Sequence, residues 1–305
     1  MFSLIIIKMR INTITHLFAP CLLLLITINI SAQRINFQTI KGHMIANVSV
    51  FDSIEAKAFM DSGCPTCIID YSIAQRAKVR LDTCSYSMFF LDFNKAIECK
   101  HKLLDTLTIN GLRCTSAVYV ADLSKLPQSD VSSISPKVIM GNKFIGKDGS
   151  RMLTLQLGKG YIEYGQKTLS DKYTPIQMEV IPDKNFASIE SLLALEDNNG
   201  KQASLVGRFV IDTGFAGDYI LFESEKVKFF IKYFKLNIKQ ISYNGRKHSY
   251  IPISSTTFLN KTSYKQSIRF KETTLRNYDG TIGFGVLKNW EIILDYSNNT
   301  LYVKK

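Results

Sequence analysis

The chain has 305 residues and a formal charge of +12 at pH 7. Its Lys and Arg residues are dispersed and form no Arg-rich arm, which argues against a nucleic-acid-binding protein. A basic charge of this kind can favour acidic polymers or anionic membranes, but it says nothing about the fold.

Residues 1–32 have the layout of a secretory signal peptide. Lys8 and Arg10 precede the apolar run LFAPCLLLLITINI, and the small residues of SAQ follow it. This run is shorter than the roughly 20 residues that a membrane-spanning helix needs, and proline and polar residues interrupt it. We therefore expect cleavage near Ala32 or Gln33, export to the periplasm or the exterior, and no stable membrane span afterwards.

The expected mature chain, residues 33–305, is long enough for one large domain or two of ordinary size. Five cysteines remain in it, and all lie in its first half: Cys64, Cys67, Cys84, Cys99 and Cys114. Export places them where disulfides can form, but their connectivity is open and an odd number leaves at least one thiol unpaired within the chain. A single C-x-x-C is weak evidence for a redox pair and weak evidence for zinc, so we expect no metal and no cofactor.

The first predicted elements are two strands and a turn. The segment from Gly42 to Asp70 begins with an apolar strand, turns through polar residues, and returns along a strand that ends in FMDSG. An apolar stretch follows, then a helix-like segment from Tyr71. Further strand-like runs continue to the segment from Val138 to Gly165, in which VIMG leads into two more strands.

The second half repeats this order. The segment from Ala187 to Phe222 again has two strands and ends its second strand in FVIDTG. A helix begins at Glu223, with apolar residues at helical spacing on a face that we expect to be buried and lysines that we expect to be solvated. The segment from Thr281 to Lys305 starts with TIGFG and ends in two strands. The chain is therefore predicted to be mostly β and to consist of two related lobes, residues 33–168 and 169–305.

The two Asp-Ser/Thr-Gly motifs suggest a chemistry. One such motif is common in turns, but two of them in matching contexts argue against coincidence. Aspartate presents a carboxylate on a tight loop, glycine allows two backbones to approach closely, and the middle hydroxyl can hydrogen-bond to the other loop. Two carboxylates held close together cannot both ionise, so they share a proton. One then activates water and the other donates to a substrate carbonyl.

On these residues the sequence resembles the pepsin-like and retropepsin-like aspartic proteases. The motifs are FMDSG, FVIDTG, VIMG and TIGFG, about a dozen residues, whereas the overall pattern covers nearly all of residues 33–305. Retroviral members bring two aspartates together by dimerising, and pepsin-like members carry both in one chain. The resemblance therefore implies a bilobal monomer with a cleft between its lobes, acting on peptide or protein substrates without a cofactor.

The resemblance also implies roles for particular residues. The catalytic pair would be Asp61 and Asp212. The residues supporting the pair would be Ser62 and Thr213 through hydrogen bonds between the loops, Gly63 and Gly214 in the tight turns, and Gly141 and Gly283 behind the loops.

The sequence departs from the family after each motif. Many members have a small or hydroxylated residue there, whereas this chain has Cys64 and Phe215. Flap residues are expected within 84–93 and 242–251, with Tyr86 and Tyr243 as candidates.

Other hydrolase classes are poorly supported. The sequence has no nucleophile-elbow serine and no local cysteine–histidine signature. The remaining alternative is a secreted relative without catalytic activity that binds peptides or glycans in the same cleft. Retention of both aspartates and both hydroxyls favours the protease.

Overall fold

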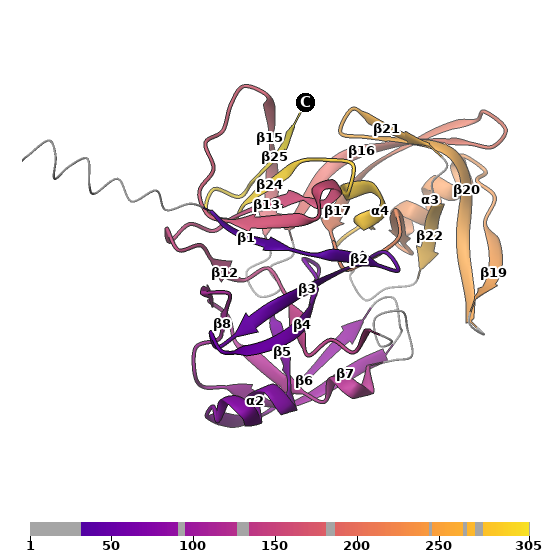
Figure 1. Ribbon diagram of the computed structural model, residues 1–305. Coiled ribbons are helices and arrows are strands. Elements are labelled where there is room, and N and C mark those ends of the chain that lie inside the picture. The colour runs from indigo at the N-terminus through magenta and orange to yellow at the C-terminus, as the bar shows by residue number, and fades with distance from the viewer. Residues whose placement is uncertain are drawn as a thin grey trace, which may run out of the picture. The chain divides into compact units, whose positions relative to one another are not determined.

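The computed structural model describes residues 32–90, 95–126, 134–180, 187–243, 246–264, 267–271 and 277–304 (Figure 1). The chain divides into two units, Met1–Ser31 and Ala32–Lys305, and the elements below belong to the second. The expected signal peptide lies outside the described residues apart from Ala32. Within the described part of the chain, no helix is long and apolar enough to cross a membrane.

Strands dominate both halves of the chain, which confirms the prediction of a mostly β protein. The first half contains β1 Gln33–Asn36, β2 Gln38–Ile40, β3 His43–Val50, β4 Ile54–Met60, β5 Cys67–Asp70, β6 Leu81–Phe90, β7 Lys95–Leu103, β8 Thr108–Ile109, β9 Leu112–Cys114, β10 Val118–Ala121, β11 Val138–Met140, β12 Phe144–Ile145, β13 Met152–Gln156 and β14 Tyr161–Tyr164. The second half contains β15 Tyr173–Val180, β16 Ala187–Asp197, β17 Gln202–Ile211, β18 Tyr219–Phe222, β19 Lys239–Tyr243, β20 Arg246–Phe258, β21 Lys261–Tyr264, β22 Ser267–Lys271, β23 Gly280–Ile282, β24 Ile292–Asp295 and β25 Thr300–Lys304. The helices are α2 Tyr71–Ala77, α3 Glu225–Tyr233, α4 Phe284–Leu287 and the short 3₁₀ turns η1 Leu123–Lys125 and η3 Leu157–Lys159.

Both predicted helices form: α2 begins at Tyr71 as expected, and α3 begins at Glu225, two residues after the expected Glu223. The N-cap of α2 is Asp70, whose side chain accepts a hydrogen bond from the backbone of Ser72, and that of α3 is Ser224. Helix α3 buries Val227 and two further apolar residues, and its lysines are solvated. The amphipathic prediction for this segment is confirmed.

The described strands form two sheets. One has the order β1-β14-β13-β24-β25-β15-β16-β17-β23-β18-β22-β20-β19, with β21 attached to β20. The other has the order β12-β9-β8-β3-β4-β11-β5-β10-β7-β6, with β2 attached to β3. The first sheet contains strands from both expected lobes, residues 33–168 and 169–305. The division of the chain into these two lobes therefore stays a prediction.

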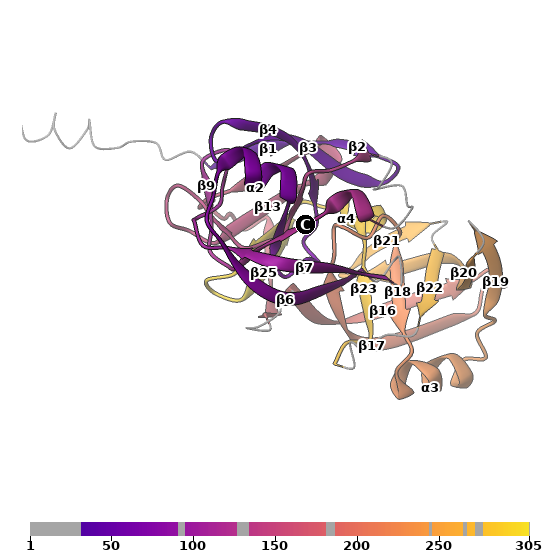
Figure 2. The same ribbon diagram turned by 90° about the horizontal axis from the view of Figure 1, so that it is seen from below.

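The two halves repeat one pattern of strand pairing. In the first half β11 is parallel to β4 and antiparallel to β5, and in the second half β23 is parallel to β17 and antiparallel to β18. Figure 2 shows part of the second half, in which β23, β18 and β22 are neighbours in the sheet. Strands β5 and β18 are buried at every position, which explains their continuous apolar sequences. The repeat seen in the sequence is therefore a repeat of structure.

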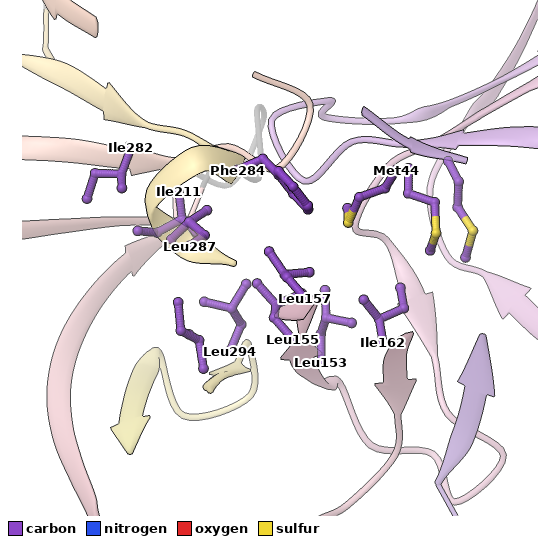
Figure 3. Packing of buried hydrophobic residues seen from close by; sticks show 14 of the residues in the cluster. Met44, Leu153, Leu155, Leu157, Ile162, Ile211, Ile282, Phe284, Leu287 and Leu294 are labelled. Atoms are coloured by element: carbon purple, nitrogen blue, oxygen red, sulfur yellow. The ribbon is translucent and has the colours of Figure 1, made fainter. Parts of the chain in front are cut away.

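Side chains from both halves share the main apolar core. Figure 3 shows part of this cluster, in which Leu155 and Leu157 gather with Ile211, Phe284 and Leu287. All five side chains are almost completely removed from solvent. The strands that precede and support the two Asp-Ser/Thr-Gly loops are thus anchored in common apolar packing, which favours a fixed geometry for the loops.

Candidate active site

The two aspartates follow equivalent strands. Asp61 comes directly after β4 and its backbone N–H donates to the carbonyl oxygen of Met140 at 3.0 Å. Asp212 comes directly after β17 and its backbone N–H donates to the carbonyl oxygen of Ile282, also at 3.0 Å. Each loop therefore starts while still hydrogen-bonded to the strand that runs beside it.

Ser62 and Thr213 interlock the two loops. The Ser62 backbone N–H donates to Thr213 Oγ1 at 2.9 Å, and the Thr213 backbone N–H donates to Ser62 Oγ at 2.9 Å. Ser62 Oγ in turn donates to the carbonyl oxygen of Ile211 at 3.0 Å. Both hydroxylated side chains are buried, so water does not compete for these bonds. Segments about 150 residues apart in sequence are thus held as one rigid unit.

The carboxyl groups of Asp61 and Asp212 lie across from one another. Each accepts a hydrogen bond from the glycine of its own loop, Gly63 N–H to Asp61 Oδ1 and Gly214 N–H to Asp212 Oδ1, both at 2.9 Å. A Cβ atom added to Gly63 would lie 2.5 Å from Asp212 Cγ, and one added to Gly214 would lie 2.3 Å from Asp61 Cγ. Each carboxyl group therefore occupies the space that a side chain on the opposite loop would need.

Gly141 and Gly283 lie directly behind the loops. A Cβ at Gly141 would come within 2.3 Å of the carbonyl oxygen of Thr66, and one at Gly283 within 2.2 Å of that of Gly217. Both neighbours are backbone atoms that cannot rotate away, so only glycine fits at these two positions. The structure brings all eight residues expected at the site into one constellation.

Two further residues contact the loops. Asn142 Nδ2 donates to the carbonyl oxygen of Ser62 at 3.2 Å, and His43 Nδ1 lies 3.2 Å from the carbonyl oxygen of Gly214. The His43 side chain is only 5% exposed and packs edge-on against Phe59. Asn142 was signalled only by its place next to a glycine motif. His43 had no signal, since 171 residues separate it from its partner.

The large side chain of Phe215, which departs from the family pattern, does not prevent its backbone N–H from bonding to Asp212. Phe215 is 3% exposed and belongs to an apolar cluster with Val210, Ile220, Phe222 and Tyr278. Its backbone N–H still donates to Asp212 Oδ1 at 3.2 Å. The large side chain therefore belongs to the apolar core.

Cys64 is a packed thiol beside the same carboxylates. It is 2% exposed, and its Sγ donates to the carbonyl oxygen of Thr66 at 2.8 Å and lies 3.7 Å from Met88 Sδ. Burial, followed by the nearby negative charge of Asp61, raises the pKa of the Cys64 thiol well above its usual range. The group is therefore protonated and a poor nucleophile at neutral pH.

The flap expectations stay predictions. Strands β6 and β7 form a long hairpin, and Tyr86 on it stacks on Tyr119 with ring centroids 3.9 Å apart. Burial, with a smaller effect of Cys64, raises the pKa of Tyr86 to about 12. The hairpin tip and the side chain of Tyr243 lie outside the described residues. Among the described side chains, no group of three His, Cys, Asp or Glu residues is arranged to hold a metal ion.

Comparison with known proteins rests on structure alone. No protein-family model matches the sequence, and no curated protein matches it. A crystal structure of an aspartic proteinase from Irpex lacteus superimposes with a TM-score of 0.55 and covers 90% of this chain and 97% of its own. The chain has the fold of an aspartic proteinase. Identity to that protein is 11%, so the likeness shows the fold and nothing further.

Proposed function

We propose that the chain is an exported aspartic endopeptidase, a hydrolase that uses Asp61 and Asp212 as its catalytic pair. One observation carries the proposal: each carboxyl group is hydrogen-bonded by its own loop and packed against the glycine of the other loop. The aspartic-proteinase fold supports it independently. A protein that only bound peptides would not require two buried hydroxyls that lock the two aspartate loops together.

In the proposed reaction the two carboxyl groups share one proton, because like charges this close do not both ionise. The ionised group takes a proton from a water molecule whose oxygen attacks the peptide carbonyl carbon. The protonated group donates to the carbonyl oxygen. Collapse of the resulting tetrahedral species breaks the C–N bond. The leaving nitrogen takes the proton that the first carboxyl group removed from water, and a hydroxyl proton of the tetrahedral species returns to the other carboxylate, so that the pair again shares one proton. The reaction consumes one water per bond and needs no metal, cofactor or covalent intermediate.

The proposed architecture is a bilobal monomer. Residues 33–168 and 169–305 would each contribute one aspartate loop, so that one chain supplies both carboxylates and no partner chain is required. Residues 1–32 would direct export and be removed, and the site would be open to peptide or protein substrates in the periplasm or outside the cell.

Cleavage of an unbiased peptide mixture tests the proposal. Purified protein comprising residues 33–305 is incubated across acid to neutral pH beside Asp212→Asn, with sedimentation used to confirm that the active species is monomeric. We expect cleavage by the wild type and none by the variant, with unchanged circular dichroism. A folded wild type that cleaves nothing at any pH would contradict the proposal and favour the peptide- or glycan-binding alternative.

A further inference from the structure

Cys67 and Cys114 are neighbours in the core although 47 residues separate them in sequence. Cys67 begins β5 and is 0% exposed, and Cys114 ends β9 and is 6% exposed. Both are free thiols in the structure, and their Sγ atoms lie 3.9 Å apart within the main apolar cluster. A disulfide requires about 2.0 Å between the sulfur atoms, so bond formation moves them together by about 2 Å.

The competing pairing within Cys64-x-x-Cys67 does not fit the fold. Cys64 belongs to a separate, smaller core cluster, in which its sulfur contacts Met88. Cys67 packs in the main cluster with Cys114. The two thiols of the motif thus pack in different parts of the core, which favours Cys114 over Cys64 as the partner of Cys67.

The contacts of the pair favour thiol chemistry. The contact between the two thiols, together with backbone and hydroxyl contacts of Ser116, lowers the pKa of Cys114 to about 6 despite its burial. Cys67 keeps its proton, because burial and its bond to Cys114 raise its own pKa. A thiolate is the nucleophile in disulfide exchange, so Cys114 is the group that reacts first.

We propose that Cys67 and Cys114 form a structural disulfide in the exported protein, made by exchange with the disulfide of an oxidoreductase or a low-molecular-weight disulfide. The Cys114 thiolate attacks one sulfur of that disulfide and releases the other as a thiol. The Cys67 sulfur, after giving its proton to solvent, then displaces the second thiol. The pair loses two electrons and two protons in total, and the oxidant gains them. Because both residues are buried in the finished fold, the exchange takes place late in folding, when Cys114 already contacts Cys67 and Ser116 but the oxidant can still reach it.

The bond would lie directly behind one aspartate loop. The Cys67 sulfur contacts the backbone N–H of Gly141, the glycine behind that loop. Thr66 directly precedes Cys67, and its hydroxyl donates a hydrogen bond to the carbonyl oxygen of Ala117. The disulfide would therefore fasten the start of β5, where the Asp61 loop ends, to the end of β9. The inference depends on the proposed export only for its oxidant, and its test does not depend on any peptidase activity of the protein itself.

Peptide mapping tests the bond. Protein expressed from the full chain is refolded in a buffer containing oxidised and reduced glutathione, denatured, alkylated and digested without reductant. We expect a linked pair of peptides carrying Cys67 and Cys114, with Cys64 alkylated. Alkylation of both Cys67 and Cys114, or a peptide in which Cys64 is linked to either, would overturn the proposal.

Thermal unfolding gives a second readout that does not depend on mapping. The measurement uses a Cys84→Ala background, because Cys84 and Cys99 lie on the paired strands β6 and β7 and the substitution excludes a cross-link between them. Refolding with excess thiol should lower the Tm by roughly 5–15 °C, the range expected for a cross-link spanning this many residues. Adding Cys114→Ala should abolish the dependence on thiol, and adding Cys64→Ala should leave it intact. A Tm that is insensitive to thiol in the Cys84→Ala protein would contradict the inference.

Discussion

Replacing Ser62 with alanine removes the hydroxyl that joins the two aspartate loops. That hydroxyl donates to the carbonyl oxygen of Ile211 at 3.0 Å and accepts from the backbone N–H of Thr213 at 2.9 Å. Both partners belong to the opposite loop and its strand, and both are buried. Ser62→Ala therefore leaves one backbone donor and one backbone acceptor without this partner in a region closed to water.

The size of the effect follows from these two groups. A buried polar group that loses its partner costs about 1–3 kcal/mol, so with two such groups the variant should lose about 2–6 kcal/mol of unfolding free energy. Domains have stabilities of about 5–15 kcal/mol, so a chain above the lower end of this range remains folded after such a loss. The loss exceeds the few tenths of a kcal/mol typical of a surface serine-to-alanine change.

Urea denaturation measures this loss. Trp290 is the only tryptophan of the chain and is 5% exposed, so its fluorescence reports global unfolding. Ser62→Thr is the matched control, because it keeps a hydroxyl at position 62 and gives this loop the residue that the second loop has at Thr213. Ser53→Ala, at an exposed serine, is the background control. A loss below about 0.5 kcal/mol for Ser62→Ala would refute the view that this hydroxyl locks the loops.

Three further predictions follow. Gly141→Ala should lower the free energy of unfolding by more than about 3 kcal/mol, because the new Cβ would lie 2.3 Å from a backbone oxygen of the loop in front of it; urea denaturation checks it. His43→Asn should keep most peptidase activity and His43→Gln should lose about tenfold or more in kcat, because the asparagine Nδ2 can replace the histidine Nδ1 donor to Gly214. Burial opposes ionisation of Glu291, yet hydrogen bonds from Tyr173 and neighbouring side chains outweigh it and hold the pKa of Glu291 well below its usual value. The stabilisation is therefore fully present above the unfolded pKa of about 4.3 and is lost progressively as the pH falls below it towards the folded pKa. Glu291→Gln should destabilise the protein at pH 7, and in urea denaturation at a series of pH values its difference from the wild type should shrink steadily below about pH 4.

Each of these has a contradicting outcome. Gly149 has open space around its Cβ position, so Gly149→Ala should cost less than Gly141→Ala, and equal costs would argue against steric exclusion. Equal activity losses in the two His43 variants would show that the ring matters for packing rather than for its donor. A pH-independent difference between wild type and Glu291→Gln would show that the carboxylate charge makes no contribution.

The sequence predicted the features that arise from local periodicity and repetition. Continuous apolar runs indicated the buried strands β5 and β18, and helical spacing with an Asp or Ser cap indicated α2 and α3. The repeated order of strand, loop and supporting glycine also indicated that Asp61 and Asp212 would occupy equivalent places. Such signals lie within a few residues of the element that they describe.

Contacts between distant segments left no comparable signal. Nothing near His43 indicates that its ring meets the carbonyl oxygen of Gly214, and nothing near Cys67 selects Cys114 over a cysteine three residues away. The sequence likewise did not indicate that Phe215 meets Asp212 through its backbone N–H while its ring packs in an apolar cluster. These relations depend on how strands pack in three dimensions, which one sequence does not encode in a local pattern.

The central claim is that Asp61 and Asp212 act as one unit. Rates for a peptide cleaved by the wild type are compared among Asp61→Asn, Asp212→Asn and the double variant, with urea denaturation confirming that all are folded. We predict that each single variant loses about a thousandfold or more and that the double variant loses no more than either, as expected for residues that catalyse one step together. Cleavage near the wild-type rate by either single variant would contradict the claim.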